Sequence, residues 1–100
     1  MNVQIGAEAA REVEEAFTYY ESDRPGRGWR FLTALEQAYR AIEDGPERWP
    51  LVAPTVRKTQ VARFPYAVLY QVRETGAHVF AVMHQRRRPG YWKDRIGGST

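Results

Sequence analysis

The residues best suited to chemistry lie together near the end of the chain, in the stretch HQRRRPGYW at positions 84–92. Cleavage of RNA without a metal needs a base for the 2′-hydroxyl proton, cations that neutralise the phosphorane, and an acid for the leaving oxygen. His84, Arg86 and Tyr91 have side chains for these three roles. Arginines at a strand end, however, more often protect a sheet edge from pairing with other chains. Both interpretations remain open at this point.

A larger basic set surrounds this stretch. Residues 51–100 hold nine Lys or Arg against two acids, a charge of +7, whereas residues 1–50 hold six Arg against ten acids, a charge of −4. A basic half attracts a polyanion or an acidic protein because steering depends on the local field. The alternative is that the two halves neutralise each other across the fold. The candidate residues for binding a target or partner are Arg57, Lys58, Arg63, Arg73, Arg86, Arg87, Arg88 and Tyr91.

The sequence carries no signature of a metal or cofactor site. It has no cysteine, which removes disulfides and thiolate ligands. His78 and His84 are expected on one face of a strand about 20 Å apart, too far to share one ion. The nucleotide-binding glycine loop, the paired histidines of zinc helices and the serine elbow are missing as well. We therefore expect neither a metal nor another cofactor.

A short strand and two amphipathic helices precede the basic half. The stretch NVQIG alternates apolar and polar residues, which predicts a strand that ends at Gly6. The first helix begins at Ala7 and stops near Pro25; the second ends at 44–46. The expected apolar stripes are Ala9, Val13, Ala16, Phe17 and Tyr20 in the first helix, and Phe31, Leu32, Leu35, Ala38, Tyr39 and Ile42 in the second. The expected exposed residues include Glu8, Arg11, Glu12, Glu15, Arg30 and Glu36.

Three later runs, at 56–64, 66–73 and 78–86, are typical of strands. In the middle run one face is fully apolar, which predicts a central strand. Period-two alternation in the last run places His84 and Arg86 on the same face as Phe80 and Val82. The predicted fold class is α+β: a short N-terminal strand and an α-helical hairpin packed on an antiparallel β-sheet with a C-terminal three-stranded meander. We expect residues 1–100 to form a single domain.

The two tryptophans outside the helices are expected to close over the core. Trp92 follows a Pro-Gly turn, and Trp49 lies in the Pro-rich bend ERWPLVAPT. The longest apolar run is too short to cross a bilayer, and the N-terminus lacks the order of a signal peptide. The sequence therefore favours a cytoplasmic protein that has no membrane partner.

Six stretches occur in a characteristic order: YYE (19–21), PGRGWRFL (25–32), LEQAYRAI (35–42), RWP (48–50), RFPYAVLYQV (63–72) and AVMHQRRRPGYW (81–92). Together they resemble the RelE/ParE superfamily of toxins from bacterial type II toxin–antitoxin modules, over nearly the whole chain. The resemblance implies the architecture already inferred. It also implies a cognate acidic antitoxin that folds over a basic groove. The assembly it implies is a toxin homodimer or a toxin–antitoxin hetero-oligomer.

The resemblance leaves the mechanism divided between two branches. RelE-like members cleave mRNA on the ribosome, and Arg63, Arg86, Tyr91, Lys58 and His84 would fill the positions of such a metal-independent endoribonuclease. ParE-like members poison DNA gyrase. The scarcity of lysines before FPY, the PGRG turn, the RWP bend and the HxRRxPxYW ending look closer to the ParE side. The expected function is a growth-arresting, plasmid-stabilizing toxin with a gyrase-type target; the alternatives are the endoribonuclease and a non-toxic antitoxin-binding or co-repressor domain.

Overall fold

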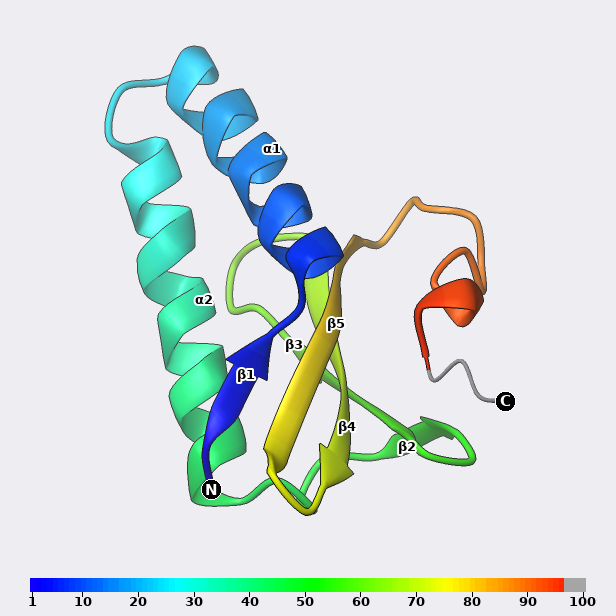
Figure 1. Cartoon of the computed structure of the whole chain (residues 1–100). Helices are drawn as coiled ribbons and strands as arrows, with labels where there is room; N and C mark the ends of the chain where they lie inside the picture. Colours follow the sequence, from blue (N-terminus) through cyan, green and yellow to red (C-terminus); the bar gives the residue numbers. More distant parts are fainter. Residues whose placement is uncertain (97–100) are drawn as a thin grey trace.

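A computed structural model describes residues 1–96 as two helices, five strands and a short 3₁₀ segment (Figure 1). The elements in chain order are β1 (Val3–Ile5), α1 (Ala7–Asp23), α2 (Arg27–Asp44), β2 (Leu51–Ala53), β3 (Val56–Gln60), β4 (Tyr66–Arg73), β5 (Gly76–His84) and η1 (Lys93–Arg95). The helical hairpin and the C-terminal three-stranded meander match the α+β prediction. The strand predicted at 56–64 is shorter, because a turn begins after Gln60.

The five strands form one mixed sheet in the order β1-β5-β4-β3-β2. The predicted meander is β3-β4-β5, and its neighbours are antiparallel. The expectation of a wholly antiparallel sheet is corrected at β1, which pairs with β5 in parallel. A fifth strand, β2, lies in the segment predicted as a bend, because Leu51 and Ala53 pair with Arg57 and Val56 of β3.

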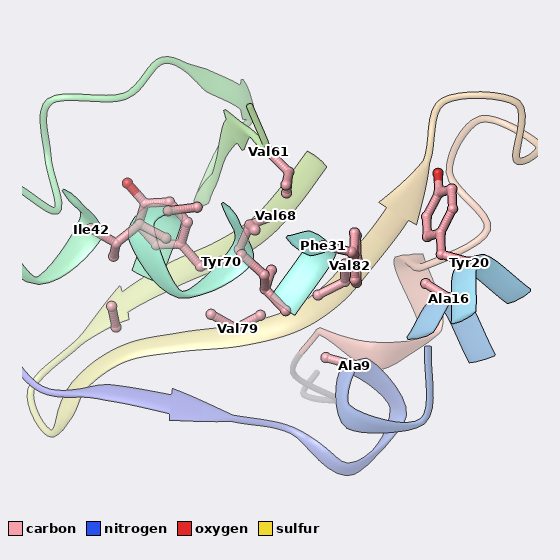
Figure 2. Packing of buried hydrophobic residues seen from close by; sticks show 13 residues of the cluster. Ala9, Ala16, Tyr20, Phe31, Ile42, Val61, Val68, Tyr70, Val79 and Val82 are labelled. Atoms are coloured by element: carbon pink, nitrogen blue, oxygen red, sulfur yellow. The ribbon is translucent and has the colours of Figure 1, made fainter. Parts of the chain in front are cut away.

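The sheet packs against different parts of the chain on its two faces. The first core lies between the helical hairpin and one face of the sheet, and Figure 2 shows Ala9, Ala16, Phe31 and Ile42 of the helices together with Val68, Val79 and Val82 of the strands. The second core lies on the other face. It consists of Val56, Leu69, Phe80, Ala81 and Trp92. Trp92 is 7% exposed and confirms the prediction of a tryptophan lid, whereas Trp49 is half-buried beside the first core.

A β-bulge in β5 reverses the predicted alternation. Tyr70 pairs with Val79 and Leu69 pairs with Ala81, so Phe80 is an extra residue in β5. Phe80 therefore packs in the second core beside Ala81.

The bulge corrects two predictions about side-chain direction. Val82 packs in the first core, opposite Phe80, so these residues do not share a face. His78 pairs with Gln71 on the second face, whereas His84 contacts Tyr66 on the first, so the two histidines lie on opposite faces. Arg86 lies beyond β5, which ends at His84.

The tip of the helical hairpin is held by Glu21 of α1. Its two carboxylate oxygens accept hydrogen bonds from the backbone N–H groups of Gly26 and Gly28, each at 2.9 Å. Gly26 has φ +92, a left-handed conformation that favours glycine. Gly28, predicted as a loop residue, lies inside α2 and is buried against Phe17. The PGRG turn therefore brings the two helices into close contact.

Replacing Gly28 with Ala is expected to destabilise the protein by about 1–3 kcal/mol, because a Cβ atom would lie 2.8 Å from the backbone oxygen of Phe17 and the helices would have to separate. This cost opposes the better helix propensity of Ala, about 1 kcal/mol. Urea unfolding measures the change. Gly45→Ala is the matched control, since its Cβ would meet only the guanidinium of the exposed Arg48, which can move. Equal stability of the two variants would contradict the close helix contact.

Candidate functional site

The basic stretch after β5 turns back on itself instead of continuing the sheet. The N–H of Gln85 donates to the carbonyl of Pro65 at 2.9 Å, and the N–H of Arg87 donates to that of His84 at 3.0 Å. The ring of His84 packs edge-on against Tyr66, with centroids 5.1 Å apart. These contacts fix the direction in which the arginines leave the sheet.

Glu12 of α1 anchors the segment that follows. Its side chain is only 10% exposed. Oε1 accepts the backbone N–H of Val82 at 2.9 Å and lies 3.0 Å from Nη1 of Arg95. Oε2 accepts the hydroxyl of Tyr91 at 2.6 Å and lies 3.9 Å from Nη1 of Arg87. One carboxylate thus joins α1, β5 and the C-terminal segment. We call Glu12 and its partners Val82, Arg87, Tyr91 and Arg95 the Glu12 cluster.

Tyr91 lies at the centre of the Glu12 cluster. The guanidinium carbons of Arg87 and Arg95 lie 3.8 Å and 4.9 Å from the centre of its ring. Burial raises the pKa of Tyr91 well above its usual value, and the hydrogen bond to Glu12 raises it further. Burial lowers the pKa of Arg95, but the hydrogen bond and charge of Glu12 outweigh it and hold that pKa above its usual value. Tyr91 is therefore a neutral hydrogen-bond donor inside the fold.

The prediction that Glu12 lies on the exposed side of the first helix is wrong. The buried residues of α1 are Ala9, Ala16 and Tyr20. Glu12 follows Ala9 by three positions and precedes Ala16 by four, so it lies on the same helical face. Two small alanines on either side of a carboxylate leave space for partners from elsewhere in the chain. The spacing of Ala9, Glu12 and Ala16 was therefore the sequence signal that Glu12 is buried.

The predicted binding residues do not form one surface. Nη1 of Arg57 donates to the carbonyls of Glu47 and Trp49, at 3.1 and 2.6 Å, so its guanidinium holds the bend before β2. Arg73 donates to Gln71 at the far end of β4. Lys58 pairs with Leu69, whose side chain belongs to the second core, so Lys58 lies on the sheet face that carries the second core.

The remaining predicted arginines fall into two separate groups. Arg86 and Arg88 are exposed on the C-terminal segment and make no ion pair within residues 1–96. Arg63 lies in the β3–β4 loop, on a groove of about 790 Å³. Three arginines of the helical hairpin line the same groove, and none of them is among the predicted binding residues: Arg24, Arg27 and Arg30. Arg30 had been predicted only as a solvated helix residue.

The five residues proposed for RNA cleavage are not assembled as a catalytic set. Tyr91 is committed to Glu12. His84 accepts the backbone N–H of Arg86 at Nδ1, 3.0 Å away, so the neutral ring carries its proton on Nε2 and its basic nitrogen is occupied. Lys58 and His84 belong to opposite faces of the sheet. These five residues therefore do not place a base, an acid and a cation around one point.

Residues 1–96 contain neither a cluster of metal-ligand side chains nor a helix suited to spanning a membrane. No group of three or more His, Cys, Asp or Glu side chains there could hold a metal ion. No helix in the same range is long and apolar enough to cross a membrane.

A helical hairpin on one face of a small sheet is the architecture that the resemblance to the RelE/ParE superfamily implies. The chain belongs to the ParE family within it: the family model described as "ParE toxin of type II toxin-antitoxin system, parDE" matches residues 3–89. The predicted resemblance to the RelE/ParE superfamily is therefore confirmed, and so is the prediction that the chain is closer to its ParE branch.

One solved structure supports the fold independently. The chain is similar to one from the "Chromosomal ParDE TA system from P. aeruginosa", with 14% sequence identity and a TM-score of 0.75. The match covers 84% of this chain and 95% of that one. A comparison with curated proteins returns no match. At this low identity the structural likeness establishes the fold alone.

Proposed function

We propose that this ParE-type toxin arrests growth by binding DNA gyrase in the cytoplasm and is neutralised by a cognate acidic antitoxin. The observation that carries the proposal is the family match over residues 3–89. The similar structure comes from a ParDE toxin–antitoxin system, which supports an antitoxin as the partner.

The chemistry of the basic residues favours binding over catalysis. A nuclease without a metal needs a base and an acid near the phosphate. Here Tyr91 and the Nδ1 atom of His84 are both engaged inside the fold, while Arg86 and Arg88 are exposed. Exposed cations suit electrostatic steering towards an acidic or DNA-bound target.

Purified protein added to gyrase is expected to inhibit supercoiling and to increase DNA breakage. Replacing both Arg86 and Arg88 with Ala should weaken this inhibition by about tenfold or more, because two exposed cations are lost from the surface that meets the target. Arg40→Ala is the control, since it removes a cation on α2 that is paired with Glu36. Normal supercoiling at doses that stop growth would contradict the gyrase target.

Induction of the chain alone separates the remaining alternatives. New mRNA 5′ ends in primer extension, with a loss of about 10²-fold or more in Arg86→Ala, would favour the ribosome-dependent endoribonuclease. Harmless overexpression would favour a non-toxic antitoxin-binding or co-repressor domain. If the chain acts on gyrase, induction is expected to cause growth arrest and a DNA damage response, and the 5′ ends of the mRNA should stay unchanged.

A further inference from the structure

The groove beside α2 has an unusual concentration of positive charge. It lies between α2 and the β3–β4 loop, and four arginines line it: Arg24, Arg27 and Arg30 from the hairpin and Arg63 from the loop. Among residues 1–96, only Arg27 of these four has an acidic partner, Asp23 at 3.6 Å, in an exposed pair of the kind that contributes little. Three cations are left without counter-charges.

The acidic residue of the hairpin tip does not neutralise them. Glu21 directs both carboxylate oxygens to the amides of Gly26 and Gly28, at the N-terminus of α2. That helix terminus therefore already has its anion. The guanidinium of Arg27 lies over the ring of Tyr20 at 5.1 Å, which fixes it beside the groove. The positive charge of the groove is available for a ligand from outside the chain.

Arg63 reaches the groove from a strained backbone. Its φ is +70, and it is the only residue other than glycine with positive φ among those described. This conformation costs a residue with a Cβ atom about 1–2 kcal/mol, and Gly would adopt it without that cost. The turn that imposes it is held by the N–H of Val61, which donates to the carbonyl of Tyr66 at 2.9 Å. A long cation at a position suited to glycine indicates that the side chain has a use.

The rest of the groove is uncharged and partly apolar. Along α2 the two arginines occupy the first turn, and the lining continues past Ala34 and Gln37, which have no charge. Ala34 and Ala62 are small enough to admit a main chain, Phe64 is half-buried, and Trp29 is 61% exposed. A nucleic acid strand carries a phosphate at every step and needs cations along its whole path. A polypeptide can place acids at one end and apolar side chains at the other.

We propose that this groove binds an acidic polypeptide segment. Its carboxylates pair with Arg24, Arg30 and Arg63, and an apolar side chain next to them packs on Phe64 and Trp29. The assignment of that segment to the antitoxin rests on the proposed function, whereas the ligand chemistry rests on the groove. The inference moves the antitoxin surface away from the C-terminal arginines, to a groove lined by Arg24 and Arg30 of the acidic half and Arg63 of the β3–β4 loop.

Fluorescence titration of the whole protein tests the proposal, because Trp29 lies in the groove and reports on it. The probe is a synthetic Glu-rich peptide that contains Leu; a thymidine oligonucleotide and inorganic phosphate are the comparison ligands. The peptide is expected to bind saturably, and more weakly as salt rises. Arg30→Ala combined with Arg63→Ala should raise its Kd by about tenfold or more. Trp29→Phe should remove the signal and so assign it to the groove.

Matched controls keep the result specific. Arg11→Ala combined with Arg40→Ala removes the same charge from exposed helix positions outside the groove and should leave the Kd within about twofold. Circular dichroism confirms that each variant is folded. The absence of saturable peptide binding would overturn the proposal, as would tighter binding of the oligonucleotide, equal competition by phosphate, or equal weakening in the controls.

The proposal and the proposed function fail separately. Peptide binding by a chain that is harmless on induction would contradict the toxin mechanism and leave the groove assignment standing. A toxic chain that inhibits gyrase without binding the peptide would contradict the groove assignment alone.

Discussion

Replacing Glu12 with Gln is expected to lower the free energy of unfolding by about 3–5 kcal/mol, the cost of removing one partner from a buried ion pair. Glu12 is 10% exposed and Arg95 is 15% exposed, so water replaces little of what is lost. The amide of Gln is uncharged and has one acceptor oxygen in place of two, so its NH₂ group faces either the Val82 N–H, which cannot accept, or the Tyr91 hydroxyl, which must then accept instead of donating. Denaturant unfolding at neutral pH measures the change.

A double-mutant cycle with Tyr91→Phe identifies the source of the effect. The double variant should cost less than the sum of the single variants, because each removes the same hydrogen bond. Glu36→Gln is the matched control on the other helix; its pair with Arg40 is exposed on both sides and should contribute less than about 0.5 kcal/mol. A strictly additive cycle would contradict the coupling of Glu12 and Tyr91.

Replacing Phe31 with Ala is expected to cost about 3–5 kcal/mol, because it empties the centre of the first core. Phe31 is 0% exposed. Its ring centre lies 5.6 Å from that of Tyr20, 5.3 Å from that of Phe64 and 5.1 Å from that of Tyr66. These rings join α1, α2 and the β3–β4 loop, so their loss should loosen the hairpin on the sheet.

Trp29→Ala is the matched control for Phe31→Ala, an equally aromatic residue two positions earlier in the same helix. Trp29 is 61% exposed and contacts the ring of Phe17 from one side, so its replacement should cost less than about 1 kcal/mol. Thermal and urea unfolding of the two variants give the comparison. Similar losses in both would show that α2 is not oriented by the buried ring.

Hydropathy patterns predicted the helices and the central strands well because the sheet and the hairpin bury complementary faces. In α2 the buried residues repeat the predicted stripe: Phe31, Leu35, Ala38 and Ile42. The edge strand β2 escaped prediction, since it is three residues long and exposes Leu51 and Val52. The bulge at Phe80 escaped as well, because every residue from Val79 to Val82 is apolar and alternation leaves no visible break there.

The site was less predictable than the fold because charge alone does not reveal a partner. Arg57 and Arg87 belong to the predicted binding set, yet Arg57 donates to backbone carbonyls and Arg87 lies beside the Glu12 carboxylate. Arg30 was assigned to the solvated helix face, although it lines the groove with Arg63. That groove depends on the left-handed turn at Arg63, and residue type gives no sign of such a turn at an arginine.

The Glu12 cluster also sets the order in which the chain can fold during synthesis. β1 pairs only with β5 in the sheet, and Glu12 finds its partners at Val82, Tyr91 and Arg95. A nascent chain therefore exposes a helix whose carboxylate lacks its full set of partners until residue 95 has been made, and its first strand has no neighbour in the sheet until β5 emerges. Contacts between such distant residues form late, because loop closure must precede them. The native surface of the C-terminal segment is consequently complete only after the chain has been made through Arg95.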